Sequence, residues 1–183
     1  SNIKKVAIEP IAEEYTFQAD TSNVKLGEGE SLFSGNVSWQ RKDDLLRSDS
    51  LRVYRDAAGD ITRWKMDEPL TWLGKDIYIQ ANAAQYTKDA GYEASDLLFL
   101  LFGSANRRIW GWAEQMEAQQ LEHAKMQEVF MTSCTPESMD WFIRSPKLVW
   151  DANKKRLRLE QPKFYMMNTY MFLILEITII IEK

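Results

Sequence analysis

The segment RSDSLRV, residues 47–53, carries the pattern that decides the fold. Its small residue, Ser48, is followed by a polar residue, and the apolar Leu51 and Val53 stand three and five positions after it. The pattern recurs in QANAAQY (80–86), WAEQMEA (112–118) and RSPKLVW (144–150), with a weaker copy near Ala19. The small residues fall at 48, 81, 113 and 145, so the spacings are 33, 32 and 32 residues. A repeat of this length predicts stacked β-units, each made of several short strands and their turns.

Turn signals divide the chain into short segments of alternating polarity. They lie at residues 27–29, 58–60, 90–91 and 151–153, and each contains Gly or the Asp and Asn types that favour turns. Between them, apolar side chains share one parity and polar side chains the other, as in a strand with one buried face. The inward positions predicted in this way are Phe33, Val37, Trp39, Leu51, Val53, Ile77 and Ile79. The chain is therefore predicted to be an all-β antiparallel sandwich of repeated hairpins.

Residues 112–130 give conflicting signals. They are rich in Ala, Gln, Glu, Met and Leu, which are good helix formers, and they contain neither Gly nor Pro. Six apolar residues of this region nevertheless carry even numbers: Trp112, Met116, Ala118, Ala124, Met126 and Phe130. Only part of this set would form a helical stripe, whereas paired strands accommodate the alternation. We predict strands here.

The composition excludes several classes of protein. A chain of 183 residues can bury roughly 70% of its unfolded surface in one core, so it requires neither a disulfide framework nor a structural metal. One cysteine, Cys134, and one histidine, His123, cannot form a Cys/His zinc site. A formal net charge of -4 disfavours binding to the phosphates of nucleic acids. We expect no metal, no cofactor and no nucleic-acid partner.

Catalysis is not expected either. Nothing in the sequence marks His123 and Cys134 as a nucleophile and its base. Carboxylate pairs such as Asp43-Asp44 are adjacent in sequence, and adjacent side chains of a strand point to opposite faces. They fit solvated turns better than the two facing carboxylates of a glycosidase. A carbohydrate-active β-sandwich or β-solenoid enzyme is kept as an alternative, which a cleft with two facing carboxylates would support.

The C-terminal segment YMFLILEITIII, residues 170–181, holds one charged residue and is rich in β-branched residues near its end. It is too short and too interrupted to cross a bilayer as a helix. An exposed strand of this composition would be prone to aggregation, so it must be paired or buried. We expect either a closing strand or the start of a larger structure that is missing.

The segment FMTSCTPESMDWFI, residues 130–143, contains a Thr-x-Cys-x-Pro pattern followed by a tryptophan. This pattern resembles the signature of the N-terminal periplasmic domain of the LPS-assembly LptD family. Weaker features before and after this segment occur in the same order as in the family. FSGNV (33–37) resembles its Gly-Asn-Val strand, GWAE (111–114) its Gly-x-Ala step, and PKFY (162–165) its Pro-x-Phe-Tyr run. The resemblance covers residues 17–165, and its collinear order is more specific than any single motif.

The resemblance implies an OstA-type β-jellyroll, a V-shaped and partly open sandwich whose apolar interior carries the acyl chains of lipopolysaccharide. In the family, this domain receives lipopolysaccharide from the periplasmic bridge LptA and passes it to a C-terminal outer-membrane barrel plugged by the lipoprotein LptE. We therefore expect non-enzymatic lipopolysaccharide transport at the periplasmic face of the outer membrane. Cys134 would be one half of an interdomain disulfide, and its partner is absent from this sequence.

The resemblance also suggests where the ligand and the partner bind. The seven inward positions would line the lipid groove, and the seven tryptophans, more than a narrow sandwich needs for its core, favour such a groove. OstA-like domains join end to end by pairing of edge strands, and Thr16, Phe17 and Val24 mark the edge expected to receive LptA. A bridge component like LptA or LptC is the alternative within the fold, which Cys134 and Trp141 disfavour.

The chain departs from the family pattern after Tyr165. There it continues with MMNTY (166–170), where the family has a Pro-Tyr pair and a polar entry to the barrel. We expect an OstA-like domain over residues 1–165 and an apolar tail over 166–183, to which we assign no role. A large barrel needs many strands of about ten residues each, so the chain is expected to lack it.

Overall fold

A computed structural model describes residues 15–102, 108–120, 122–135 and 137–180. The described residues form strands and turns, with no helix and hence none that could cross a membrane in that form. The strands are β1 Tyr15–Gln18, β2 Thr21–Asn23, β3 Gly29–Arg41, β4 Asp44–Arg55, β5 Ile61–Met66, β6 Leu70–Leu73, β7 Ile77–Thr87, β8 Gly91–Phe102, β9 Arg108–Gln120, β10 His123–Thr132, β11 Trp141–Asp151, β12 Arg156–Glu160, β13 Lys163–Met166, β14 Thr169–Leu173 and β15 Glu176–Ile180. The all-β class is confirmed. In the region with conflicting signals, residues 112–120 lie in β9 and residues 123–130 lie in β10.

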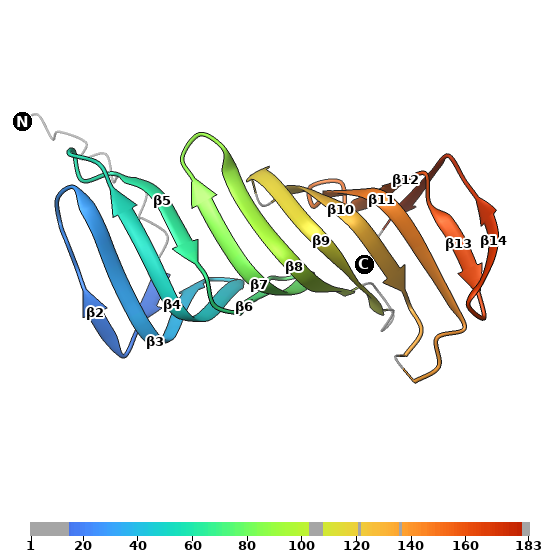
Figure 1. Ribbon diagram of the computed structural model, residues 1–183, viewed down its shortest axis with the longest axis horizontal. Coiled ribbons are helices and arrows are strands. Elements are labelled where there is room, and N and C mark those ends of the chain that lie inside the picture. Colours follow the sequence, from blue (N-terminus) through green and yellow to red (C-terminus); the bar gives the residue numbers. More distant parts are fainter. Residues whose placement is uncertain (1–14, 103–107, 121, 136, 181–183) are drawn as a thin grey trace, which may run out of the picture.

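The strands form one antiparallel sheet that follows the chain order. Its main path runs β1-β3-β4-β5-β7-β8-β9-β10-β11-β12-β15. Strand β2 pairs with β3, β6 with β4 and β7, and β13 with β11 and β14. Figure 1 shows the strands succeeding one another along the longest axis, from β2 in blue to β14 in red. Within the described residues, the sheet therefore ends in two open edges, formed by β1 and β2 at one end and by β14 and β15 at the other.

Bends in the middle of the long strands fold the sheet into two layers. Strands β5 and β6 are two parts of one bent strand, because both pair with β4 and β7. Strands β12 and β13 are related in the same way and both pair with β11. The β5 layer contains β2, β5, β12 and β15, and the β6 layer contains β1, β6, β13 and β14. Strands β3, β4 and β7 to β11 run through both layers.

The sequence repeat coincides with these bends. Its small residues are Ser48, Ala81, Ala113 and Ser145, and all four are buried where β4, β7, β9 and β11 pass from one layer to the other. These strands run in the same direction and alternate with strands of the opposite direction. One repeat of 32 or 33 residues is therefore a pair of bent strands with their turns. A small side chain is needed at the bend because the inner faces of both layers converge there.

Side chains change parity at the bends, so that both halves of a strand keep their apolar side inward. On β10, Met126 before the bend and Val129 after it both belong to the core. Between them, Glu128 takes a left-handed conformation with φ 50°. The even-numbered set predicted for residues 112–130 therefore does not share one face. Its members within 116–126 are buried in the core, but Trp112 and Phe130 point outward because they lie beyond the bends.

Glu128→Gly is expected to raise the free energy of unfolding by about 1 kcal/mol, because glycine adopts a positive φ without steric cost. The thermal midpoint should rise by about 2–4 °C in a chain of this size. Glu117→Gly is the matched control: Glu117 is also an exposed strand residue, but no positive φ is recorded there. The free energy of unfolding of the control should fall by about 0.5–1 kcal/mol. Equal losses in both variants would show that Glu128 is not strained.

Candidate lipid-binding interior

The interior between the two layers is apolar and closely packed in its middle. Leu97, Phe99, Leu157 and Leu159 are at most 1% exposed. The gap between the layers is too narrow for a water molecule; its lining is Ile77, Phe99, Leu101, Met126, Leu148, Trp150 and Leu157. These residues come from both layers, so the gap lies between their inner faces. An apolar ligand can occupy this position only if the layers move apart.

All seven inward positions predicted from the sequence lie on the inner faces, but at different depths. Val37, Val53, Ile77 and Ile79 are buried, whereas Phe33, Trp39 and Leu51 are half-buried. Ile77 and Ile79 belong to the main core, and Leu51 packs against it. Phe33 and Leu51 are directly opposite each other on β3 and β4. The seven residues therefore form a strip from the N-terminal end to the middle of the interior, and their contact with lipid stays a prediction.

The N-terminal end of the interior is bordered by two aromatic rings from different layers. The Phe17 ring of β1 packs edge-on against the Phe33 ring of β3, with 4.9 Å between the ring centroids. Phe17 is 36% exposed, so this end of the interior is accessible to solvent. The predicted docking edge is thus composite: Thr16 and Phe17 contribute the backbone of β1, Val24 is exposed just after β2, and the Phe17 ring turns inward.

The C-terminal end carries a second aromatic group, which the sequence prediction missed. Trp141 of β11 stacks on Phe164 of β13 with centroids 6.0 Å apart, and Phe164 stacks on Phe172 of β14 with centroids 5.2 Å apart. Trp141 and Phe164 pack against the core, while Phe172 is 47% exposed. The interior therefore has an accessible aromatic surface at each end and a packed middle.

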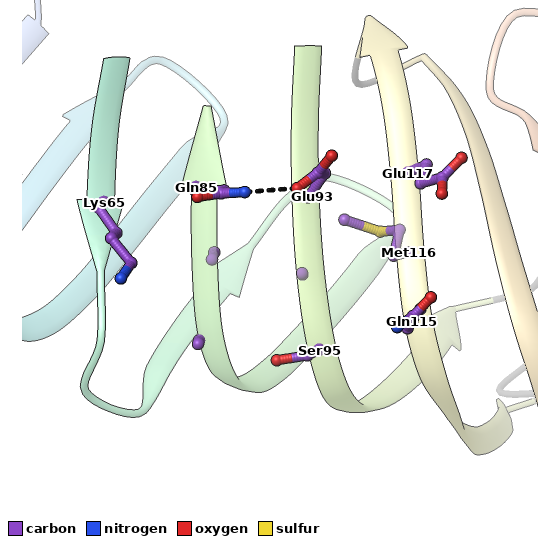
Figure 2. Close-up of a pocket in the computed structure, with 10 residues that line it drawn as sticks. Lys65, Gln85, Glu93, Ser95, Gln115, Met116 and Glu117 are labelled. Atoms are coloured by element: carbon purple, nitrogen blue, oxygen red, sulfur yellow. Dashed lines mark hydrogen bonds between the residues drawn. The ribbon is translucent and has the colours of Figure 1, made fainter. Parts of the chain in front are cut away.

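A separate hollow on the outer face of the β5 layer is polar. Figure 2 shows Lys65, Gln85, Glu93, Ser95, Gln115 and Glu117 around it, on strands β5, β7, β8 and β9. The side-chain amide of Gln85 donates a hydrogen bond of 2.5 Å to the Glu93 carboxylate. Glu93 and Glu117 are directly opposite on neighbouring strands of one sheet. They lie side by side, unlike the carboxylates of a glycosidase, which face each other across the substrate.

Cys134 is free and half-buried in the turn that follows β10. Its amide donates a hydrogen bond to the Thr132 hydroxyl, and its carbonyl accepts one from the Trp110 indole. Burial alone would raise the pKa of the Cys134 thiol, but hydrogen bonds from the Trp141 backbone, the Thr132 side chain and the Asp140 backbone together lower it. His123 lies at the opposite end of β10, about 30 Å away along the strand, so it cannot act as a base for this thiol.

These features define a class of protein: a two-layer antiparallel β-jellyroll whose apolar interior runs between the two edges left open in the part of the chain that the structure describes. Residues 16–156 match the family described as LptA/(LptD N-terminal domain) LPS transport protein. The chain belongs to this family.

Two individual proteins are also similar to the chain. It is 26% identical over 162 residues to the LPS-assembly protein LptD of Alkalilimnicola ehrlichii, a match that covers 86% of the chain and 20% of that protein. The chain therefore spans about a fifth of the length of this relative. Among solved structures, it is similar to LptH of Pseudomonas aeruginosa, described as the LptA homologous periplasmic component of the conserved lipopolysaccharide transport device. That likeness has a TM-score of 0.35 and 8% sequence identity, and it covers 85% of this chain and 96% of LptH.

Proposed function

We propose that the chain is a non-enzymatic carrier that holds the acyl chains of lipopolysaccharide between its two layers. The observation that carries this proposal is the apolar interior that is accessible at both ends, through Phe17 and through Phe172. An elongated apolar ligand would enter at one end and leave at the other. Because Phe99 and Leu157 close the middle, its passage requires the layers to separate. Energy for this movement would come from elsewhere in the transport system.

In this proposal, the two sheet edges that are open among the described residues bind different partners. We assign the β1 and β2 edge to an LptA-type partner, because the unpaired backbone of an edge strand can extend the sheet of another chain. The β14 and β15 end would deliver lipopolysaccharide to an outer-membrane barrel with LptE. The chain would then act at the periplasmic face of the outer membrane, where Cys134 would form a disulfide with the barrel. A thiol whose pKa is lowered is more readily oxidised in that compartment.

Photo-crosslinking tests the interior as the lipid site. A photoreactive residue at Val53 or Ile79 is expected to form adducts with lipopolysaccharide in the intact transport system, because both side chains point inward and are buried. The matched controls are the next residues along the same strands that point outward and are exposed, Arg52 and Gln80. Adducts of equal yield at inward and outward positions would contradict the proposal. So would adducts at neither pair, when a crosslinker in LptA captures lipopolysaccharide in the same cells.

Phe17→Pro is expected to abolish binding of LptA, measured by affinity capture with the full chain. Proline removes a backbone N–H and disrupts pairing in the middle of β1, which is paired with β3 from Tyr15 to Gln18. Thr178→Pro is the control, because it makes the same change in the middle of β15, which pairs with β12 at the opposite end of the sheet. Unchanged capture by Phe17→Pro would place the partner elsewhere on the chain. Equal loss with Thr178→Pro would show a general disruption of the sheet rather than a role of β1 in binding.

A further inference from the structure

The outer face of the β6 layer is also apolar, although the core covers only its inner face. The clearest sign is the C-terminal half of β8, whose six residues LLFLLF (97–102) are all apolar. Leu97, Phe99 and Leu101 are buried in the core, whereas Leu98 points outward and is 40% exposed. A continuous apolar run is typical of a strand that is covered on both faces, while a strand with one solvated face alternates. This half of β8 therefore has the sequence of a strand whose outer face is covered.

Aromatic rings extend this outer surface across the neighbouring strands. Trp112 stacks on Phe130 at 4.3 Å, Phe130 on Phe142 at 4.9 Å and Phe142 on Tyr165 at 4.7 Å between centroids. Tyr165 contacts Tyr170 edge-on, at 5.8 Å. These rings point away from the core because alternate residues on their strands, such as Ala113, Met131 and Ile143, belong to it. Phe130 and Phe142 are each only 6% exposed, whereas Trp112 and Tyr170 are 45% and 51% exposed. We call this surface the outer aromatic face: Leu98, Trp110, Trp112, Phe130, Phe142, Tyr165 and Tyr170.

Basic and acidic side chains occupy different parts of this face. Arg144 is directly opposite both Phe130 and Lys163, and both basic residues are exposed. The Arg144 guanidinium lies 5.7 Å from the Phe142 ring centroid and 6.0 Å from that of Tyr165. The carboxylates of Asp96, Glu114 and Glu128 are exposed along the bend, which is the border with the β5 layer. The outer aromatic face is therefore aromatic and basic, with a row of acidic residues along one side.

We propose that the outer aromatic face docks the chain on the surface of an anionic lipid bilayer. Trp and Tyr have an apolar body and a polar tip, and both are enriched at membrane interfaces. Arg144 and Lys163 complement the negative charge of the lipid headgroups. The acidic row is repelled by the same headgroups, so it limits the contact to the β6 layer and fixes the orientation of the strands. The outer face of the β5 layer, including its polar hollow, then remains in water.

Cosedimentation of the full chain with vesicles tests the proposal. Binding to vesicles of phosphatidylethanolamine and phosphatidylglycerol is expected, weaker at high salt, with much less binding to phosphatidylcholine alone. Arg144→Glu and Leu98→Ser are each expected to weaken binding by about tenfold. The matched controls are Lys125→Glu, an exposed basic residue on the outer face of the β5 layer, and Ile61→Ser, an exposed apolar residue of β5. Both controls are expected to bind like the unmodified chain.

Three results would overturn this inference. One is no binding to anionic vesicles, and another is equal weakening by Arg144→Glu and Lys125→Glu, which would indicate a general charge effect. The third is a dimer in the absence of lipid that Leu98→Ser dissociates, since the face would then be an interface between two copies of the chain. Arg144→Glu is expected to leave lipopolysaccharide adducts at Ile79 unchanged. Failure of bilayer docking can therefore be distinguished from failure of the proposed transport function.

Discussion

Gly111→Ala is expected to lower the free energy of unfolding by about 3 kcal/mol, the upper end of the range for overpacking a core. Gly111 is buried in β9, directly opposite Phe99 on β8 and Met131 on β10. A Cβ atom at this position would overlap the backbone carbonyl oxygen of Phe130 and lie 2.9 Å from the Cζ atom of Phe99. The carbonyl belongs to a neighbouring strand, so relief requires a shift of the β9–β10 ladder. The reason for glycine here is close approach of the backbone.

Thermal and urea unfolding of the full chain measure this effect. The midpoint temperature of Gly111→Ala is expected to fall by about 6–12 °C. Gly27→Ala is the matched control, because a Cβ atom at Gly27 would meet nothing within 4 Å. Its midpoint should stay within about 2 °C of that of the unmodified chain. A Gly111→Ala variant as stable as this control would show that β9 and β10 are less closely packed than described.

The class of fold was predictable because two regularities of the sequence are direct consequences of the structure. The spacing of 32 or 33 residues is the length of two bent strands with their turns. The small residues at the bends, such as Ala81 and Ser145, recur at this spacing in the sequence. Alternation then identified the inner face of single half-strands, including Ile77 and Ile79. Both signals depend on local geometry, so they can be read from one sequence without knowledge of which strands pair.

The alternation of apolar and polar residues did not predict the inner face correctly across the bends, or in strands with apolar residues on both faces. The parity reversal at Glu128 follows from a left-handed residue, and glutamate gives no sign of such a conformation in a sequence. Trp141 and Phe142 are adjacent on β11, yet they belong to different aromatic groups on opposite faces. The tryptophans were therefore only partly predictable as a groove lining. Trp64, Trp72, Trp141 and Trp150 pack in or against the core, but Trp110 and Trp112 lie on the outer aromatic face.

The division of the chain at Tyr165 stays a prediction, and the structure describes how the strands around it pair. Strand β13 extends from Lys163 to Met166, across the predicted boundary. The tail continues both layers, since β14 pairs with β13 and β15 pairs with β12. Most apolar residues of the described part of the tail thus lie in strands, in line with a closing strand of the sheet. Residues 1–14, 103–107, 121 and 136 of the predicted domain and 181–183 of the tail lie outside the described residues.

Phe99→Ala is expected to lower the free energy of unfolding by about 3–5 kcal/mol, because it removes a ring that is 0% exposed and leaves a cavity between the layers. Its neighbour supplies the control: Leu98→Ala, on the outer face of the same strand, should cost less than about 1 kcal/mol. Urea unfolding of both variants measures the difference between the two faces of β8. Equal costs would contradict the assignment of the inner face as the core and the outer face as accessible surface.

The same variant connects stability with the proposed ligand. The void left by Phe99→Ala would lie in the narrow gap between the layers, and an apolar cavity of this kind binds apolar molecules in preference to water. A ligand that binds only the folded chain raises its midpoint, so a saturated fatty acid should stabilise Phe99→Ala more than the unmodified chain. Leu98→Ala should gain no more than the unmodified chain, because it enlarges no interior space. If the fatty acid stabilises neither variant, the interior is a closed core, and acyl chains would have to travel along another surface of the protein.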